Sequence, residues 1–174
     1  MADELLEPAP PAPTDPRLPF NARQIFKLQK SWKGVKRNLE ATGVEMFVRM
    51  FRNNDDLRLL FTKFRNLKTV DELRLDENVE LHGKIVMDVI DEVISNIENV
   101  DYVLELMKNT GRIHRRFAGF TASYFWHIEK PFLEAVKITL GDRYSDNMDV
   151  IYKIFISFLL KHLEQGMTET NCVT

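Results

Sequence analysis

The sequence predicts an all-α domain, and three observations support that prediction. Apolar residues recur at spacings of three and four through most of the chain after Phe20, which is the period of a helix face. No segment alternates apolar and polar residues with period two, and no Asn-Gly hairpin signal occurs, so no sheet is expected. Six of the seven prolines lie in the first 19 residues, and only Pro131 remains to interrupt a helix.

Composition limits the classes of protein that the chain can belong to. At 174 residues, with 44% hydrophobic and 29% charged side chains, it has the size of one domain that buries its own core. A net charge of −2 gives no global attraction to nucleic acid or to an anionic membrane. Cys172 is the only cysteine, which excludes an intrachain disulfide and a Cys-rich metal site. With no signal-peptide pattern and no membrane-spanning apolar run, a cytoplasmic protein is expected.

The prolines predict the domain boundaries. Residues 1–19 are predicted to be a Pro-rich disordered arm, residues 20–166 the folded domain, and residues 167–174 a flexible tail. Proline fixes φ and lacks the N–H that a helix needs, so the arm is expected to be extended and to dock no helix on the domain. Deleting residues 1–19 is therefore expected to leave the fold intact, and any partner of the arm is unidentified.

The first helix is predicted to begin at Asn21, whose spacing to Gln24 is that of a capping box. Its inward face has apolar residues at steps of four, three and four: Leu28, Trp32, Val35 and Leu39. Gly43 is expected to open a second helix, with Phe47, Val48 and Phe51 pointing inward.

Shorter elements are expected between the second helix and the next long one. Asp55 and Asp56 can cap a short third turn that ends near Phe61. Residues 65–76 are polar and irregular, which predicts a loop with one helical turn.

Two helices are predicted in the middle of the chain. A long amphipathic helix runs from about Glu77 to Ile97. Another is predicted to start at Asn99 or Asp101. Gly111 falls inside this second helix, where glycine is unfavourable because it weakens a helix interior.

Two more helices complete the prediction. One spans Ala122 to Leu140, with a bend expected at Pro131 and an end at Gly141. The last spans Asn147 to Gln165 and is expected to end at Gly166.

Two histidines stand on apolar faces of separate predicted helices. His82 lies four residues before Val86, and His114 lies four residues after Thr110, so both are predicted to point into the core. Burying two polar rings costs free energy unless the rings have an interaction partner, such as a shared ligand. An apolar pocket with opposed imidazoles suits a flat, apolar ligand that carries iron. The residues expected around this pocket are Phe47, Phe61, Val86 and Phe120.

The remaining polar residues support no rival site. His127 is expected on an outer or mixed face, and His162 near a helix end where the helix dipole favours it. Arg112, Arg115 and Arg116 form a basic cluster that is expected to be a solvated face, although one of them could pair with a carboxylate of a bound ligand. The chain has no H-E-x-x-H, no Glu three residues before a histidine, no phosphate loop and no G-x-S-x-G.

Three segments together resemble a known family. FVRMFRNNDDLRLLFTKFRNL is similar to its second and third helices and the corner after them, ELHGKIVMDVI to its distal helix, and GRIHRRF to its proximal-ligand segment. The family is the globins, and from about Ala22 to Gly166 the chain is most similar to invertebrate and neuronal-type members. Gly43 and Gly83 also fall where two globin helices cross closely. Asp55 replaces the proline that usually opens the third helix, and the chain between the two histidines is a few residues longer than in storage globins.

The resemblance implies a globin fold of about seven to eight helices around a buried haem of type b, since no C-x-x-C-H is present for covalent attachment. It implies that His114 is the proximal axial ligand of the iron and that His82 is the distal residue, available as a second axial ligand. Phe61 would wedge against the haem. The other implied haem contacts are Phe47, Phe64, Val86, Phe120 and Phe125.

Three functions stay open from the sequence. The first is reversible binding of dioxygen, or another diatomic gas, for storage, delivery or sensing. The second is a six-coordinate haem protein in electron transfer or nitric oxide chemistry, including a dioxygenase-type side activity, because the same two histidines serve both uses. The third is a non-haem helical module that binds partners through the Pro-rich arm. A homodimer is compatible with all three.

Overall fold

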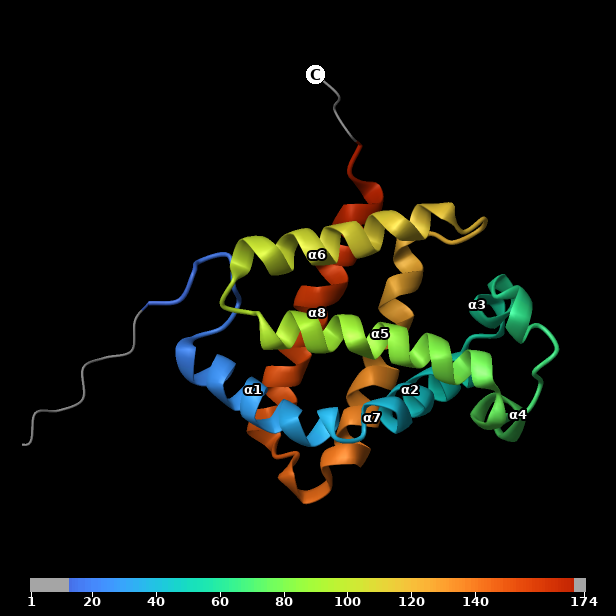
Figure 1. The fold of residues 1–174 in the computed structure, drawn as a ribbon, viewed down its shortest axis with the longest axis horizontal. Coiled ribbons are helices and arrows are strands. Elements are labelled where there is room, and N and C mark those ends of the chain that lie inside the picture. Colours follow the sequence, from blue (N-terminus) through green and yellow to red (C-terminus); the bar gives the residue numbers. More distant parts are fainter. Residues whose placement is uncertain (1–12, 171–174) are drawn as a thin grey trace, which may run out of the picture.

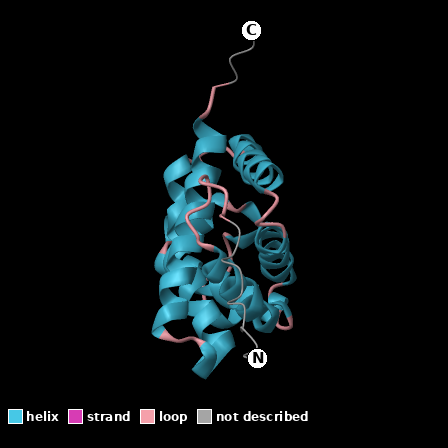
Figure 2. Ribbon diagram, turned by 90° about the vertical axis from the view of Figure 1, so that its left-hand side faces the viewer, coloured by secondary structure: helices cyan, strands magenta, loops and turns pink. Residues whose placement is uncertain are grey.

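The computed structural model describes residues 13–170, and in that range every regular element is a helix (Figures 1 and 2). The α-helices are α1 (Ala22–Lys36), α2 (Leu39–Asn53), α3 (Asp55–Leu60), α4 (Val70–Leu75), α5 (Glu77–Ser95), α6 (Val100–Ile113), α7 (Glu129–Leu140) and α8 (Asp146–Thr168). Short 3₁₀ helices join them: η1 (Thr62–Phe64), η2 (His114–Arg116), η3 (Ala122–Ile128) and η4 (Gly141–Arg143). The all-α prediction is confirmed.

The long helices pack across one another at steep angles. In Figure 1, α5 and α6 lie across α7 and α8, whose axes run nearly at right angles to theirs in this view. The most extensive helix contacts join α6 to α8, α2 to α5, and α2 to α7. Each helix therefore buries its apolar face against helices from distant parts of the chain, which encloses one continuous core.

Polar side chains cap the starts of several helices. Asn21 and Gln24 form the predicted capping box at α1, and Thr69 with Glu72 forms a second one at α4. The Asp76 carboxylate accepts from two backbone N–H groups at the start of α5. These caps satisfy donors that would otherwise lack partners, so they fix where each helix begins.

The first two helices divide at a different place from the prediction. α1 ends at Lys36, so Leu39 opens α2 and does not continue the face of α1. The reason is Asn38, whose non-helical backbone breaks the chain direction while its carbonyl accepts the N–H of Thr42. Gly43 consequently lies inside α2 and does not open it.

Two further predictions about helix ends need correction. The chain from Ala122 to Leu140 is a 3₁₀ helix followed by α7, and Pro131 lies in the first turn of α7, where its missing N–H costs no helical hydrogen bond. Gly166 does not end the last helix, because α8 continues to Thr168. Gly141 does end α7, as predicted, with a φ of 55°.

Part of the expected N-terminal arm is packed on the domain. Leu18 and Phe20 are buried in the core, and the Phe20 ring lies 6.2 Å from that of Phe158 on α8. Arg17 pairs with Asp101 on α6. The folded part therefore begins before residue 20, whereas residues 1–12 of the arm, and Cys172 in the tail, lie outside the described residues.

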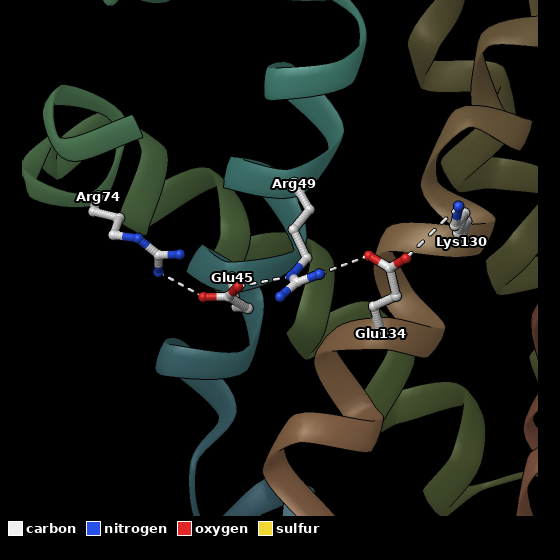
Figure 3. A network of polar contacts seen from close by, with 5 residues as sticks. All are labelled: Glu45, Arg49, Arg74, Lys130 and Glu134. Carbon is white, nitrogen blue, oxygen red and sulfur yellow. Dashed lines mark hydrogen bonds and ion pairs between the residues drawn. The ribbon is translucent and has the colours of Figure 1, made fainter. Parts of the chain in front are cut away.

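A chain of ion pairs crosses one surface of the molecule from α4 to α7 (Figure 3). The Glu45 carboxylate on α2 binds Arg74 of α4 at 2.5 Å and Arg49 at 2.7 Å. Arg49 also reaches Glu134 on α7 at 2.8 Å. The hydrogen bond from Arg74, helped by that from Arg49, lowers the pKa of the Glu45 carboxyl even though partial burial opposes this.

No helix among the described residues is both long and apolar enough to cross a membrane. The helices are instead amphipathic, with apolar faces turned to the core described above.

We expect Leu18→Ala to lower the free energy of unfolding by ~2–3 kcal/mol, because it removes a buried aliphatic side chain and leaves a cavity. Urea denaturation measures this. Leu75→Ala is the matched control, since Leu75 is 84% exposed and the change is expected to stay within ~0.5 kcal/mol. Equal stability of the two variants would contradict the packing of residues 13–19 on the domain.

We expect Glu45→Gln to cost ~1 kcal/mol at neutral pH, because it removes the shared carboxylate of two ion pairs. The pKa of Glu45 is lower in the folded state than its ordinary value of 4.5, so the stabilisation is complete above that value and is lost as the pH falls through the folded pKa. Denaturation at a series of pH values should show the variant and the parent converging in acid. Glu105→Gln, at an exposed position on α6, should give no such convergence.

Candidate functional site

An apolar cavity of about 150 Å³ lies between the long helices. No charged side chain is among its lining residues. Those residues are Met46, Phe47, Met50, Leu57, Phe61, His82, Ile85, Val86, Val89, Ile90, Thr110, His114, Phe120, Tyr124, Phe125, Ile128, Ile156, Leu159, Leu160 and Leu163. The cavity is therefore suited to an apolar ligand, and its only ionisable groups in the neutral pH range are two imidazoles.

His82 reaches one wall of the cavity from α5. Its ring makes edge contacts with two aromatic rings, at centroid distances of 5.0 Å to Phe47 and 5.1 Å to Phe61. Burial lowers the pKa of His82 to about 4, and the neighbouring His114 adds to the effect. The ring is therefore neutral at physiological pH, with one nitrogen that accepts and one that donates.

His114 reaches the cavity from the turn at the end of α6. Its Nδ1 lies 2.7 Å from the carbonyl oxygen of Thr110. A carbonyl only accepts, so Nδ1 carries the proton and the Nε2 lone pair is left free. Burial also lowers the pKa of His114, while the Thr110 carbonyl opposes this. The result is a neutral imidazole whose tautomer and orientation are held by its own helix.

Aromatic rings pack around both histidines. On the His114 side, Phe125 and Phe120 lie 4.8 Å and 5.2 Å from the imidazole. On the His82 side, Phe61 stacks on Phe64 at 5.1 Å, and both contact Phe51. These clusters fix the ring positions without adding charge to the cavity.

The structure brings together nearly all of the residues singled out in the sequence. Seven of them line the cavity: Phe47, Phe61, His82, Val86, His114, Phe120 and Phe125. Phe64 does not line it, because it is buried behind Phe61. His82 lies within α5 as predicted, whereas His114 lies just past the end of α6, because α6 ends at Ile113 and His114 begins a 3₁₀ turn.

The back wall of the cavity was not identified from the sequence. It comes from α8 and consists of Ile156, Leu159, Leu160 and Leu163. Helical periodicity predicts which residues of a helix point inward, but it cannot distinguish a residue that packs against another helix from one that faces a cavity. Thr110 was likewise read as part of a helix stripe, and its carbonyl proves to be the partner of His114.

The other histidines have ordinary surroundings. His127 is exposed beside Tyr124, with 5.7 Å between the ring centroids. The His162 ring nitrogen Nδ1 bonds the Phe158 carbonyl one turn earlier in α8. Among residues 13–170, no group of three or more His, Cys, Asp or Glu side chains could hold a metal ion. Arg115 is exposed, as expected of a solvated face, and its guanidinium also donates to backbone carbonyls at the end of α8.

The crossing of α2 with α5 places His82 opposite Phe47. Gly43 and Gly83 meet there, and a Cβ added to Gly43 would lie 2.9 Å from the Gly83 carbonyl oxygen. Real side chains avoid such a distance, so the close approach requires both glycines. The predicted reason for these two glycines is thereby confirmed.

Comparisons with known proteins agree with this geometry. The family model described as Globin matches residues 44–163. Cytoglobin-1 of Oryzias latipes is 25% identical over 130 residues, covering 75% of this chain and 71% of the relative. Neuroglobin of Dissostichus mawsoni is 28% identical over 140 residues, covering 80% and 87%.

A solved structure is more similar still. It is described as the crystal structure of a hexacoordinated heme protein from an anhydrobiotic tardigrade at pH 4, and it is 41% identical to this chain. The TM-score is 0.86, and the match covers 90% of this chain and all of the other. With a family model that spans most of the folded residues, a shared fold, and the two histidines facing one apolar cavity, the chain belongs to the globin family.

Proposed function

We propose that this globin binds a type-b haem between His82 and His114 and binds dioxygen, or another diatomic gas, reversibly at the haem iron. The observation that carries the proposal is the pair of neutral imidazoles that face one uncharged cavity from two different helices. Membership of the globin family and the similarity to a hexacoordinated heme protein support it.

The residues present fit such a group. A porphyrin is flat and mostly apolar, and the cavity lining is aliphatic and aromatic apart from Thr110, Tyr124 and the two histidines. The sequence has no C-x-x-C-H, so retention of the haem would depend on coordination and burial, as in type-b proteins. Ferrous haem, when bound, supplies an iron atom that takes up small diatomic gases.

His114 is the residue that would hold the iron. Its Nδ1 donates to the Thr110 carbonyl, which orients the ring and leaves Nε2 as the ligating atom. Phe125 and Phe120, whose own centroids lie 5.0 Å apart, pack together against the ring and limit its rotation. The imidazole is thus presented in the tautomer that metal binding needs before any metal is present.

His82 has two uses on the opposite wall. As a neutral ring it can donate a hydrogen bond to a gas ligand, which stabilises the partial negative charge of dioxygen. It can also bind the iron itself in the resting state. The similarity to a hexacoordinated heme protein favours this second use. We therefore propose a resting six-coordinate state, with electron transfer or nitric oxide chemistry as the alternative function.

The surrounding rings keep water out. Phe47 and Phe61 contact the edge of His82, and Val86 lies one turn further along α5. These apolar side chains would exclude water from the face of a bound haem that lies toward His82.

The optical spectrum of the purified protein tests the proposal, and His114→Ala is the decisive variant. The parent protein should show a Soret band. We expect the variant to lose haem or to bind it weakly, because it lacks the oriented ligand. His127→Ala is the matched control, since that ring is exposed, and it should keep the parent spectrum. A parental Soret band and parental haem retention in His114→Ala would refute the assignment.

His82→Leu distinguishes the two uses of His82. If His82 binds the iron at rest, the ferrous spectrum should change from six- to five-coordinate, and carbon monoxide should bind faster and with simpler kinetics. If it only donates a hydrogen bond, the ferrous spectrum should stay five-coordinate. Dioxygen dissociation should then rise by roughly ten- to a hundredfold, since a hydrogen bond to a charged acceptor contributes ~1.5–3 kcal/mol. A variant with neither change would place His82 outside the ligand pocket.

A further inference from the structure

We infer that the crossing of α6 with α8, built from Gly111, Gly166 and Arg115, is a positioning device for His114. On this view, contacts outside the cavity set how far the His114 imidazole reaches toward the iron and hence the strength of the iron–histidine bond. The inference rests on the proposed haem function. Gly111, Gly166 and Arg115 do not line the cavity themselves.

The two glycines bring two helix backbones into direct contact. A Cβ added to Gly111 would lie 2.0 Å from the carbonyl oxygen of Leu163, and one added to Gly166 would lie 2.1 Å from that of Lys108. Both obstacles are backbone atoms, so no side chain can rotate to make room. Gly43 and Gly83 at the α2–α5 crossing leave 2.9 and 3.0 Å, which makes the α6–α8 crossing much the tighter of the two.

The contact lies next to the atoms that orient His114. Gly111 is three residues before His114, and it directly follows Thr110, whose carbonyl accepts the His114 Nδ1–H. On the other helix, Leu163 contributes its backbone to the crossing and its side chain to the cavity wall. Close-packed backbones transmit displacement with little loss, so the separation of α6 from α8 determines the position of the imidazole against that wall.

Arg115, the residue directly after His114, makes a second set of contacts between this segment and α8. Its guanidinium donates to the carbonyl of Met167 at 2.6 Å, to that of Gly166 at 3.2 Å, and to that of Glu169. These carbonyls belong to the end of α8, where helical partners run out. Lys108 adds an ion pair with Glu169 at 3.3 Å. The chain is therefore fastened to α8 both before His114, at Gly111, and directly after it, at Arg115.

Two variants test the device without altering any cavity residue. Gly111→Ala forces the helices apart, and Arg115→Met removes the fastening at the surface while keeping an unbranched side chain. Resonance Raman measurement of the iron–histidine stretch, taken in the ferrous protein after photolysis of carbon monoxide, reports on the His114 bond alone. Transfer of haem to apomyoglobin and the melting temperature are measured alongside it.

We expect both variants to lower the frequency of the iron–histidine stretch and to speed haem transfer, by roughly tenfold for Gly111→Ala, which corresponds to ~1.4 kcal/mol. Gly43→Ala is the matched control, because it opens a glycine crossing on the opposite side of the cavity. It should leave the stretch at the parental frequency, whatever its effect on melting temperature.

Three results would overturn the inference. One is a parental stretch in Arg115→Met, which decides the matter even if Gly111→Ala does not fold. Another is a parental stretch in a folded Gly111→Ala protein that merely melts earlier, because the crossing is then only structural. The third is an equal shift in Gly43→Ala, because the effect is then not specific to this crossing. Failure of the proposed function is recognised separately, since the parent protein would then show no Soret band.

Discussion

The arrangement of this molecule depends on keeping two imidazoles neutral inside an uncharged cavity. A buried histidine with a charge would need a counter-ion, and none of the residues that line the cavity could supply one. Burial lowers the pKa of both rings, so each is present as a donor–acceptor pair of nitrogens and not as a cation. The Nδ1–H of His114 donates a hydrogen bond to the backbone carbonyl of Thr110. Neutral imidazoles in an apolar lining therefore suit an apolar ligand with a metal at its centre.

Each histidine-bearing helix is placed by a pair of glycines. His82 precedes Gly83, which lets α5 approach α2, and His114 follows Gly111, which lets α6 approach α8. Glycine lowers helix stability by about 1 kcal/mol relative to alanine, so four helical glycines are a considerable cost. That cost is offset by backbone contact at the two points where a small shift would alter the distance between the imidazoles. The helices on the other side of these two crossings are α2 and α8, and both also contribute residues to the cavity lining.

Local patterns in the sequence predict the all-α class and which residues face inward, and the family resemblance supplies the globin fold and the rest of the site. Helical periodicity placed His82, His114 and Phe47 on inward faces, and the Asn21–Gln24 spacing located the start of α1. The errors arose where a distant contact overrides a local signal. Gly166 resembles a helix end, yet it lies inside α8, because α6 approaches it there. Pro131 resembles a bend, yet the break comes three residues earlier, at Ile128.

The N-terminal arm shows the same limitation in another form. Proline density predicts a segment without helix, and that much agrees with residues 13–19. It does not predict that Leu18 and Phe20 fill a space beside α8, because burial there depends on the surfaces that the folded domain offers. The α8 wall of the cavity escaped detection for the same reason. Side-chain spacing defines a helix face, but the neighbour of that face is set by the tertiary structure.

Charge is separated from the cavity by the thickness of one helix. Glu45 and Phe47 are two residues apart on α2, about 200° around the helix axis, so they lie on opposite faces. Phe47 contacts His82, while Glu45 joins α2 to α4 and, through Arg49, to α7. Protonation of Glu45 would loosen α4 without adding or removing a charge beside the imidazoles. Protonation of Glu45 therefore reaches the cavity only through the packing of α2 against α5, whereas His82 takes up a proton on its own account near its pKa of about 4.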